Sequence, residues 1–182
     1  IIIIRDPRAI LLSRINSDKN HYGFKTSSLR KHQTVRSVDK FFKGLVNLLK
    51  SPYRNRILLV KYEDLVLEKE SVIKEIAMFL EIESEKILFS PTIFGYNSEV
   101  TTSSSKFENK DSKHEVFKDS LDKWKNKLSN FEKRLASFVL LNKKVQDRFE
   151  YDSTYKKGSY LIYYKLRVIY IIKKYLIKIF SR

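Results

Sequence analysis

Four consecutive isoleucines open the chain, and the charged run Arg5-Asp6-Pro7-Arg8 follows them without a break. An unbroken β-branched stretch of this kind is typical of a strand buried on both faces of a parallel sheet. Asp is favoured as the N-cap of a helix and Pro at its first position, so Asp6 and Pro7 predict that a helix begins at once. We expect this helix to end near residue 15 and a polar loop to occupy residues 16–34.

Hydrophobic spacing predicts the elements that follow. A broad apolar face at helical spacing predicts a helix from Ser37 or Val38 to the Ser51-Pro52 pair. Residues 57–60 predict a second buried strand, and residues 68–80 and 131–143 have the spacing of further helices. This order predicts an α/β fold with a parallel sheet. We expect one domain over residues 1–150 and a basic amphipathic helix over residues 151–182.

The net charge indicates an anionic partner. The 182 residues include 37 Lys and Arg against 21 Asp and Glu, a formal charge of +16, and residues 153–182 contain no acid. A charge of this size attracts nucleotide phosphates, acidic polymers or anionic lipid. The chain has no Cys, so no disulfide marks an oxidising compartment, and we expect a cytoplasmic location. Its three scattered His predict no metal site.

The segment from Arg5 to Ser13 has the composition of an anion site. The predicted strand delivers Arg5 to the carboxyl edge of the sheet, where ligands of open α/β sheets bind. The helix then begins with its N–H groups and positive dipole end at that edge. Arg5 has bidentate reach to a phosphate, the Ser13 hydroxyl adds a hydrogen-bond donor, and Arg8 is a second nearby cation.

Three segments resemble sulfotransferases that use 3′-phosphoadenosine 5′-phosphosulfate (PAPS). Residues 1–14 are similar to the family's strand that ends in Arg-Asp-Pro-Arg, with a Ser eight residues after the first Arg. Residues 58–65, with Tyr62-Glu63-Asp64-Leu65, resemble a second family strand that ends in Tyr-Glu-Asp-Leu. Residues 118–126 resemble more weakly the region where members place a basic residue before a Trp-Lys pair; of the Arg-Lys-Gly that the family's cytosolic branch has there, only Lys118 is matched.

The resemblance implies a function and a donor site. It implies a P-loop-like three-layer α/β/α fold, no metal, and sulfuryl transfer from PAPS to a hydroxyl or amine, with a carbohydrate or glycolipid as first choice. The family's roles place Arg5 and Ser13 at the 3′-phosphate of the donor, Tyr62 near the adenine and Lys118 near the 3′-phosphate. The family's 5′-phosphosulfate loop and catalytic base precede this region. We therefore expect an N-terminally truncated chain that does not turn over alone.

Structural roles compete with these assignments. Arg5 could pair with Asp64, and Ser13, Tyr62 and Lys118 could be ordinary helix or packing residues. Trp124 is expected in the core and the His residues on the surface. Two other functions also remain open: a basic binding module for nucleic acid or acidic polymer, and a nucleotide kinase-like fragment. The binding module explains the charge and the basic tail but not the two strand motifs, and the kinase-like fragment shares the fold layout. We expect no nucleic acid partner.

The last segment mixes aromatic and aliphatic residues with cations. Its longest apolar run has five residues, far fewer than the roughly 20 that a spanning helix needs. As a helix, residues 159–182 would be amphipathic and basic, which fits the surface of an anionic membrane. Packing on the domain as a final helix and binding of a partner or acidic glycan are the alternatives.

Overall fold

The computed structural model of the chain describes residues 1–89, 92–93, 96–97, 119–152 and 154–180. The chain divides into two compact units. The strand unit consists of Ile1–Arg5 and Pro52–Asp122, and the helical unit consists of Asp6–Ser51 and Lys123–Arg182. Each unit has its own internal packing and is considered by itself.

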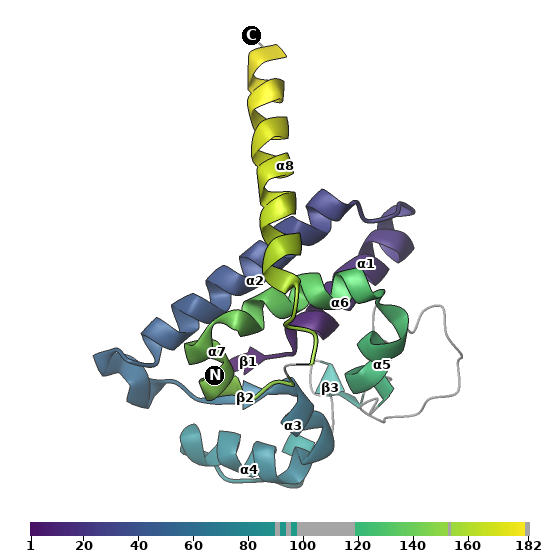
Figure 1. The fold of residues 1–182 in the computed structure, drawn as a ribbon. Coiled ribbons are helices and arrows are strands. Elements are labelled where there is room, and N and C mark those ends of the chain that lie inside the picture. Colours follow the sequence, from purple (N-terminus) through teal and green to yellow (C-terminus); the bar gives the residue numbers. More distant parts are fainter. Residues whose placement is uncertain (90–91, 94–95, 98–118, 153, 181–182) are drawn as a thin grey trace. The chain divides into compact units, whose positions relative to one another are not determined.

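Two short parallel strands form the centre of the strand unit. Strand β1 (Ile2–Ile4) pairs with β2 (Leu59–Lys61), with Ile4 opposite Lys61, and the two lie side by side in Figure 1. Ile4 and Val60 are buried, as expected for β-branched residues of a parallel sheet. Both predicted strands and their parallel pairing are therefore confirmed.

Helices follow the second strand immediately. Helix α3 (Tyr62–Leu67) begins at the end of β2, and α4 (Lys69–Phe79) follows it close to the predicted residues 68–80. Among its described residues, this unit also contains the 3₁₀ turns η1 (Pro52–Arg56) and η2 (Lys86–Phe89) and a short antiparallel pair, β3 (Thr92–Ile93) with β4 (Tyr96–Asn97). Helix α5 (Asp119–Lys127) passes from the strand unit into the helical unit.

The helical unit begins with two long helices, α1 (Pro7–Tyr22) and α2 (Ser28–Leu48). The Asp6 cap and Pro7 at the first helical position are confirmed. The predicted loop over residues 16–34 is wrong, because only residues 23–27 separate the helices. Gly23 ends α1 with a φ of 67°, in the left-handed region that glycine adopts without strain, and Ser27 caps α2.

A buried acid, Asp18, holds several of the polar residues between 16 and 34 in place. Asp18 is fully buried and accepts hydrogen bonds from the Thr26 hydroxyl at 2.8 Å and from Arg30 Nε and Nη2 at 2.9 and 3.1 Å. Burial alone would raise the pKa of Asp18, but these hydrogen bonds and the charges of Arg14 and Arg30 lower it below the usual value. The polar residues that suggested a loop therefore join the two helices.

The C-terminal part adds further helices to the same unit. Helix α6 (Asn130–Ser137) has Ser129 as its N-cap, in a capping box with Glu132. The single helix expected over residues 131–143 is broken: η3 (Phe138–Leu141) follows α6, and α7 (Lys143–Phe149) begins after Asn142. Phe149 packs edge-on against the buried ring of Phe42, which ties α7 to α2.

The last helix, α8 (Ser159–Phe180), packs with its N-terminal half on α2, α6 and η3. Tyr163 stacks on Phe138 with ring centroids 3.6 Å apart, and His32 of α2 lies 4.7 Å from the Tyr163 ring. Among the described residues, no helix has both the length and the apolar character that crossing a membrane requires.

The fold as a whole is mixed, dominated by helices, with a small parallel sheet. This agrees with the expected α/β class at that coarse level. The three-layer α/β/α arrangement and the domain boundary at residue 150 stay predictions.

Candidate functional site

Arg5 and Tyr62 are the first residues after the two parallel strands. Because Ile4 and Lys61 are paired in the sheet, the next residue of each strand lies at the same carboxyl edge. The guanidinium carbon of Arg5 is 4.3 Å from the centroid of the Tyr62 ring, and both side chains are half-buried. The structure thus brings together two of the four predicted site residues, at the edge where open α/β sheets bind ligands.

The contact between Arg5 and Tyr62 fixes one cation in place. A guanidinium over a Tyr ring is attracted to the electron-rich face, an effect of about 0.5–1 kcal/mol at exposed sites and about 2 kcal/mol when water is excluded. The planar fork of Arg can still direct N–H groups at a phosphate from its edge. The aromatic ring therefore orients Arg5 without neutralising its charge.

The acids next to Tyr62 have a local role. Glu63 and Asp64 lie in the first turn of α3, where negative charge interacts favourably with the helix dipole. Asp64 is exposed and makes no ion pair with Arg5, both residues being within the described part of the chain. The structure therefore does not support the alternative in which Arg5 pairs with Asp64.

The start of α1 is closed by its own side chains. Asp6 is buried, and its carboxylate accepts the N–H of Arg8 at 2.8 Å. Pro7 has no N–H, and the N–H of Ile10 donates to the Asp6 carbonyl at 3.0 Å. Asp6 thus places a carboxylate where an anionic ligand was expected to meet the helix N-terminus. The expected contribution of this helix end to anion binding stays a prediction.

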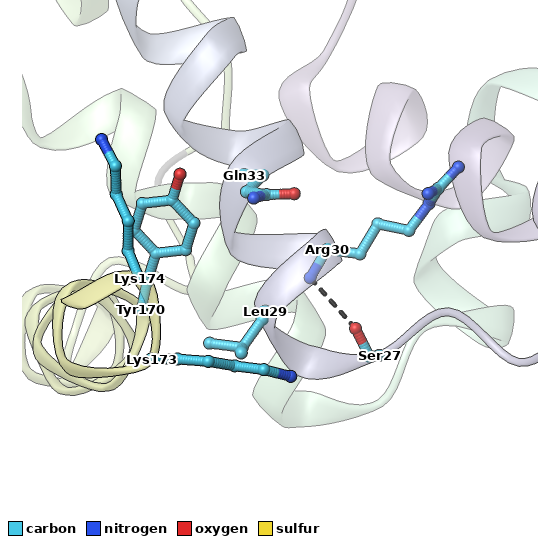
Figure 2. Close-up of a pocket in the computed structure, with 7 residues that line it drawn as sticks. All are labelled: Ser27, Leu29, Arg30, Gln33, Tyr170, Lys173 and Lys174. Atoms are coloured by element: carbon cyan, nitrogen blue, oxygen red, sulfur yellow. Dashed lines mark hydrogen bonds between the residues drawn. The ribbon is translucent and has the colours of Figure 1, made fainter. Parts of the chain in front are cut away.

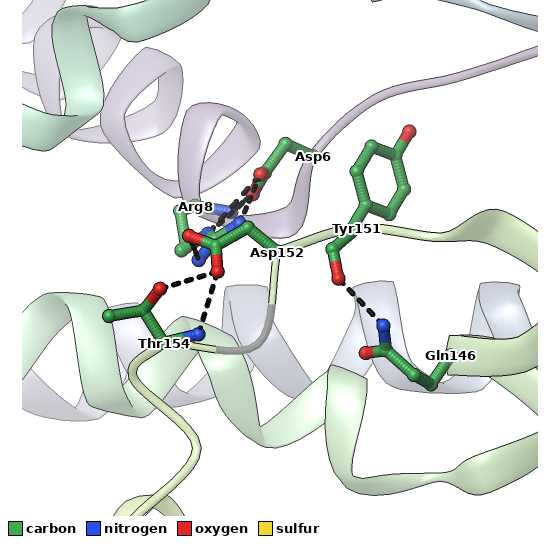
Figure 3. A network of polar contacts seen from close by, with 6 residues as sticks. All are labelled: Asp6, Arg8, Gln146, Tyr151, Asp152 and Thr154. Carbon is green, nitrogen blue, oxygen red and sulfur yellow. Dashed lines mark hydrogen bonds and ion pairs between the residues drawn. The ribbon is translucent and has the colours of Figure 1, made fainter.

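Arg8 is a structural residue (Figure 3). Its side chain is 1% exposed, and it donates from Nε and Nη2 to the Asp6 carboxylate at 2.9 and 2.6 Å. The guanidinium carbon lies 3.9 Å from the centroid of the Trp124 ring, which is buried as expected. The interpretation of Arg8 as a second cation for the ligand is therefore wrong, because its charge is compensated inside the helical unit.

Asp152 completes the surroundings of Arg8. Its Oδ2 lies 3.5 Å from Arg8 Nη1, an ion pair without a hydrogen bond. The Thr154 hydroxyl and N–H both donate to Asp152, and these bonds together with the charge of Arg8 lower the pKa of Asp152 below the usual value. Figure 3 shows Asp6 and Asp152 on two sides of the Arg8 guanidinium. The sequence did not indicate Asp152, which is 144 positions after Arg8.

The other two predicted site residues, Ser13 and Lys118, are not tested by the structure. Ser13 lies on α1 with an exposed side chain, two turns after the helix start. Arg5 belongs to the strand unit and Ser13 to the helical unit, so their joint binding of one phosphate stays a prediction. Lys118 lies outside the described residues, and its assignment also stays a prediction.

His32 is a buried group that the sequence analysis missed. It was expected at the surface, but it is fully buried between α2 and α8, near the rings of Tyr163 and Tyr170. Neither ring nitrogen has a hydrogen-bond partner among the described residues. Burial, followed by the charges of Arg36 and Arg167, lowers the pKa of His32. His32 at α2 is therefore a neutral packing residue; its spacing from Val35 and Phe42 on one helix face was the available signal.

A pocket of about 440 Å³ lies between α2 and α8 (Figure 2). It is lined by Ser27, Leu29, Arg30, Gln33, Tyr170, Lys173 and Lys174. The Arg30 side chain points away from α8, towards its partner Asp18. None of Arg5, Ser13 and Tyr62 lines this pocket, so it is distinct from the predicted donor site.

Comparison with known proteins gives one result. A family model described as the sulfotransferase domain matches residues 1–144. The matched range contains both parallel strands and all four predicted site residues, and helix α8 lies outside it. No curated protein and no solved structure matches the chain.

Proposed function

Because the chain belongs to the sulfotransferase domain family, we propose that it binds the 3′-phosphate of the sulfuryl donor PAPS at the sheet edge formed by Arg5 and Tyr62. The family resemblance seen in the sequence is confirmed by the match over residues 1–144. The identity of the donor, the identity of the acceptor and the roles of individual residues belong to the proposal.

The observation that carries the proposal is the position of Arg5. It follows a buried parallel strand and lies over the ring of Tyr62. Ligands of open α/β sheets bind at this edge, and a guanidinium there can donate two parallel hydrogen bonds to a phosphate. We assign the 3′-phosphate to Arg5, with Ser13 as a further donor and Lys118 as a third contact.

Tyr62 has two roles in the proposed donor site. Its ring holds the Arg5 guanidinium, and the same strand end is where the resemblance implies adenine. The phosphate site and the base site are therefore neighbours at one end of the sheet, as a 3′-phosphorylated adenosine requires.

In the reaction, the S–O bond between sulfur and the bridging phosphate oxygen of PAPS breaks while the acceptor oxygen or nitrogen bonds to sulfur. Adenosine 3′,5′-bisphosphate leaves, and a base takes the acceptor proton. By analogy with phosphoryl transfer, catalysis depends mainly on positioning and on charge that stabilises the leaving group. Arg5 and its neighbours would position the donor through the phosphate that does not react.

We further propose a hydroxyl or amine of a carbohydrate or glycolipid as the acceptor. The sequence contains no Gly-rich loop with Lys of the kind that holds a 5′-phosphosulfate. We therefore assign the 3′-phosphate half of the donor site to these residues, and we expect no turnover by the 182 residues alone.

Calorimetric titration of the chain with adenosine 3′,5′-bisphosphate tests the proposal. We expect binding that Arg5→Ala weakens about tenfold or more, since a charge-assisted hydrogen bond contributes about 1.5–3 kcal/mol. Arg54→Ala is the matched control, because it removes the same charge from an exposed residue of the strand unit. Absence of binding, or equal weakening by both variants, would contradict the proposal.

A further inference from the structure

Helix α8 has an apolar stripe that other elements leave uncovered within the described part of the chain. Its members are 54–73% exposed. They are Leu161, Val168, Ile172, Tyr175 and Ile179. At 3.6 residues per turn, these five positions fall within about 60° of arc on one side of the helix. A continuous stripe along a helix of 22 residues is far more than a scattered exposed side chain and indicates a surface that something covers.

The opposite side of α8 holds the helix on the body of the helical unit. Tyr163 and Leu166 are buried, and Tyr163 stacks on Phe138 of η3. After Tyr170, every described side chain of α8 is exposed, and Figure 1 shows this half of the helix extending beyond α2 and α6. The stripe therefore points outward from a helix that is anchored at its other end.

Cations lie on both flanks of the stripe. Helical spacing places Lys165 and Lys173 about 40° and 120° from Leu161 on one side, and Arg167 and Lys174 about 120° and 140° from it on the other. Lys173 and Lys174 therefore lie nearer the packed side, where they line the pocket beside α2. All four are exposed, and none makes an ion pair within the described residues. Long basic side chains beside an apolar stripe can extend to lipid phosphates while the stripe enters the acyl region.

We propose that α8 binds the surface of an anionic lipid bilayer, lying in its plane with the stripe between Leu161 and Ile179 towards the acyl chains. This goes beyond the donor site, because α8 lies outside the range of the sulfotransferase match. A bilayer surface provides both partners that the helix requires, apolar area for the stripe and negative charge for the flanks.

The charges of α8 favour lipid over a second copy of the chain. Residues 153–182 carry eight cations and no acid. Two α8 helices paired along their stripes would bring the flanking lysines of one copy against those of the other. Like charges at such positions are destabilising. Nucleic acid would satisfy the cations but would leave the apolar stripe in water, so it fits the surface less well.

Vesicle co-sedimentation of the full chain tests this inference. We expect binding to phosphatidylcholine vesicles that contain phosphatidylglycerol, little binding to phosphatidylcholine alone, and weaker binding as salt rises. Two variants separate the contributions: Val168→Asp with Ile172→Asp removes the stripe, and Lys165→Gln with Lys173→Gln removes two cations. Each should lower binding about tenfold or more, since each basic residue contributes about 1 kcal/mol near an anionic surface.

The matched control is Leu67→Asp with Met78→Asp, which adds the same charges at exposed apolar residues of the strand unit. This control adds negative charge but leaves the stripe intact. It should therefore lower vesicle binding less than the stripe variant does. Circular dichroism of each variant checks that its helices are retained. Equal binding by the chain and the stripe variant would overturn the inference. The inference would also be overturned if the chain did not bind vesicles but formed dimers that the stripe variant dissociates. That result would identify a second copy of the chain as the partner.

Discussion

Arg8 and Asp6 are joined by three side-chain hydrogen bonds, from Nε at 2.9 and 3.2 Å and from Nη2 at 2.6 Å, and both residues are buried. The Asp6 carboxylate also caps helix α1 through the N–H of Arg8. The two arginines of Arg5-Asp6-Pro7-Arg8 therefore have different surroundings. Arg5 lies at the strand end over Tyr62, and Arg8 lies inside the helical unit against Trp124.

Substitution of Arg8 should destabilise the fold strongly. Arg8→Met removes one partner of a buried ion pair, which typically costs about 3–5 kcal/mol. Chemical denaturation at neutral pH measures the loss in free energy of unfolding. Arg14→Met is the control: its partner Asp18 keeps the bonds from Thr26 and Arg30, so the loss should be about 1 kcal/mol or less.

A double variant separates the charge from the packing of Arg8. If loss of the charge pair causes the destabilisation, Asp6→Asn combined with Arg8→Met should lose less stability than the sum of the two single variants. Additive losses would mean that the packing of Arg8 on Trp124 dominates and that the pair with Asp6 contributes little.

Removal of the Tyr62 ring should affect ligand binding through Arg5. Tyr62→Leu takes away the surface on which the guanidinium lies, and we expect affinity for adenosine 3′,5′-bisphosphate to fall about three- to tenfold, in keeping with about 1 kcal/mol for the contact. Tyr62→Phe keeps the ring and should remain within about twofold. Calorimetry checks both. A larger loss in the Phe variant than in the Leu variant would assign the effect to the hydroxyl instead.

Acid should remove the stability that Asp18 supplies. Its pKa is lowered in the folded chain, so the ionised form is favoured there and its contribution is fully present above the usual Asp pKa of 3.8. The contribution is lost as pH falls from that value through the lowered pKa. The difference in unfolding free energy between the chain and Asp18→Asn should therefore shrink over this range. If this difference in unfolding free energy stayed constant as the pH fell below 3.8, the stabilising role of the hydrogen bonds around Asp18 would be contradicted.

His32 should make the contact between α2 and α8 sensitive to pH, in a pH range above the one in which Asp18 acts. Because its pKa is lowered in the folded chain, the unfolded chain takes up this proton first as the pH falls. The stability that neutral His32 supplies is present above the usual value of 6.5 and is lost from there down through the lowered pKa. His32→Phe keeps an aromatic ring and cannot titrate.

Thermal unfolding of both chains across this pH range measures the effect. The chain should lose stability relative to His32→Phe as the pH falls below 6.5. The other histidines are the same in both chains, so the difference reports His32. Parallel curves would show that protonation of His32 does not disturb the helix contact.

Local sequence rules were sufficient where one segment determines its own structure. The strand before Arg5 and the cap at Asp6 each depend on neighbouring residues, and both are present. The contact between Arg5 and Tyr62 was not predicted, because it depends on the register in which the two parallel strands pair.

Prediction failed where a polar residue is satisfied by a distant one. The many polar residues of 16–34 suggested a loop, although hydrogen bonds from Arg30 to Asp18 join α1 and α2 there. Arg8 looked like a ligand cation because Asp152 and Trp124, more than a hundred residues later, could not be placed beside it. His32 was misplaced because its burial depends on α8.

The central claim is that Arg5 binds the 3′-phosphate, and the most direct measurement compares two nucleotides that differ by that group. The affinities of the chain and of Arg5→Ala for adenosine 3′,5′-bisphosphate and for adenosine 5′-monophosphate form a cycle. We predict that the chain prefers the bisphosphate by about tenfold or more and that Arg5→Ala loses most of this preference. An equal preference in both chains, or none in the unmodified chain, would contradict the claim.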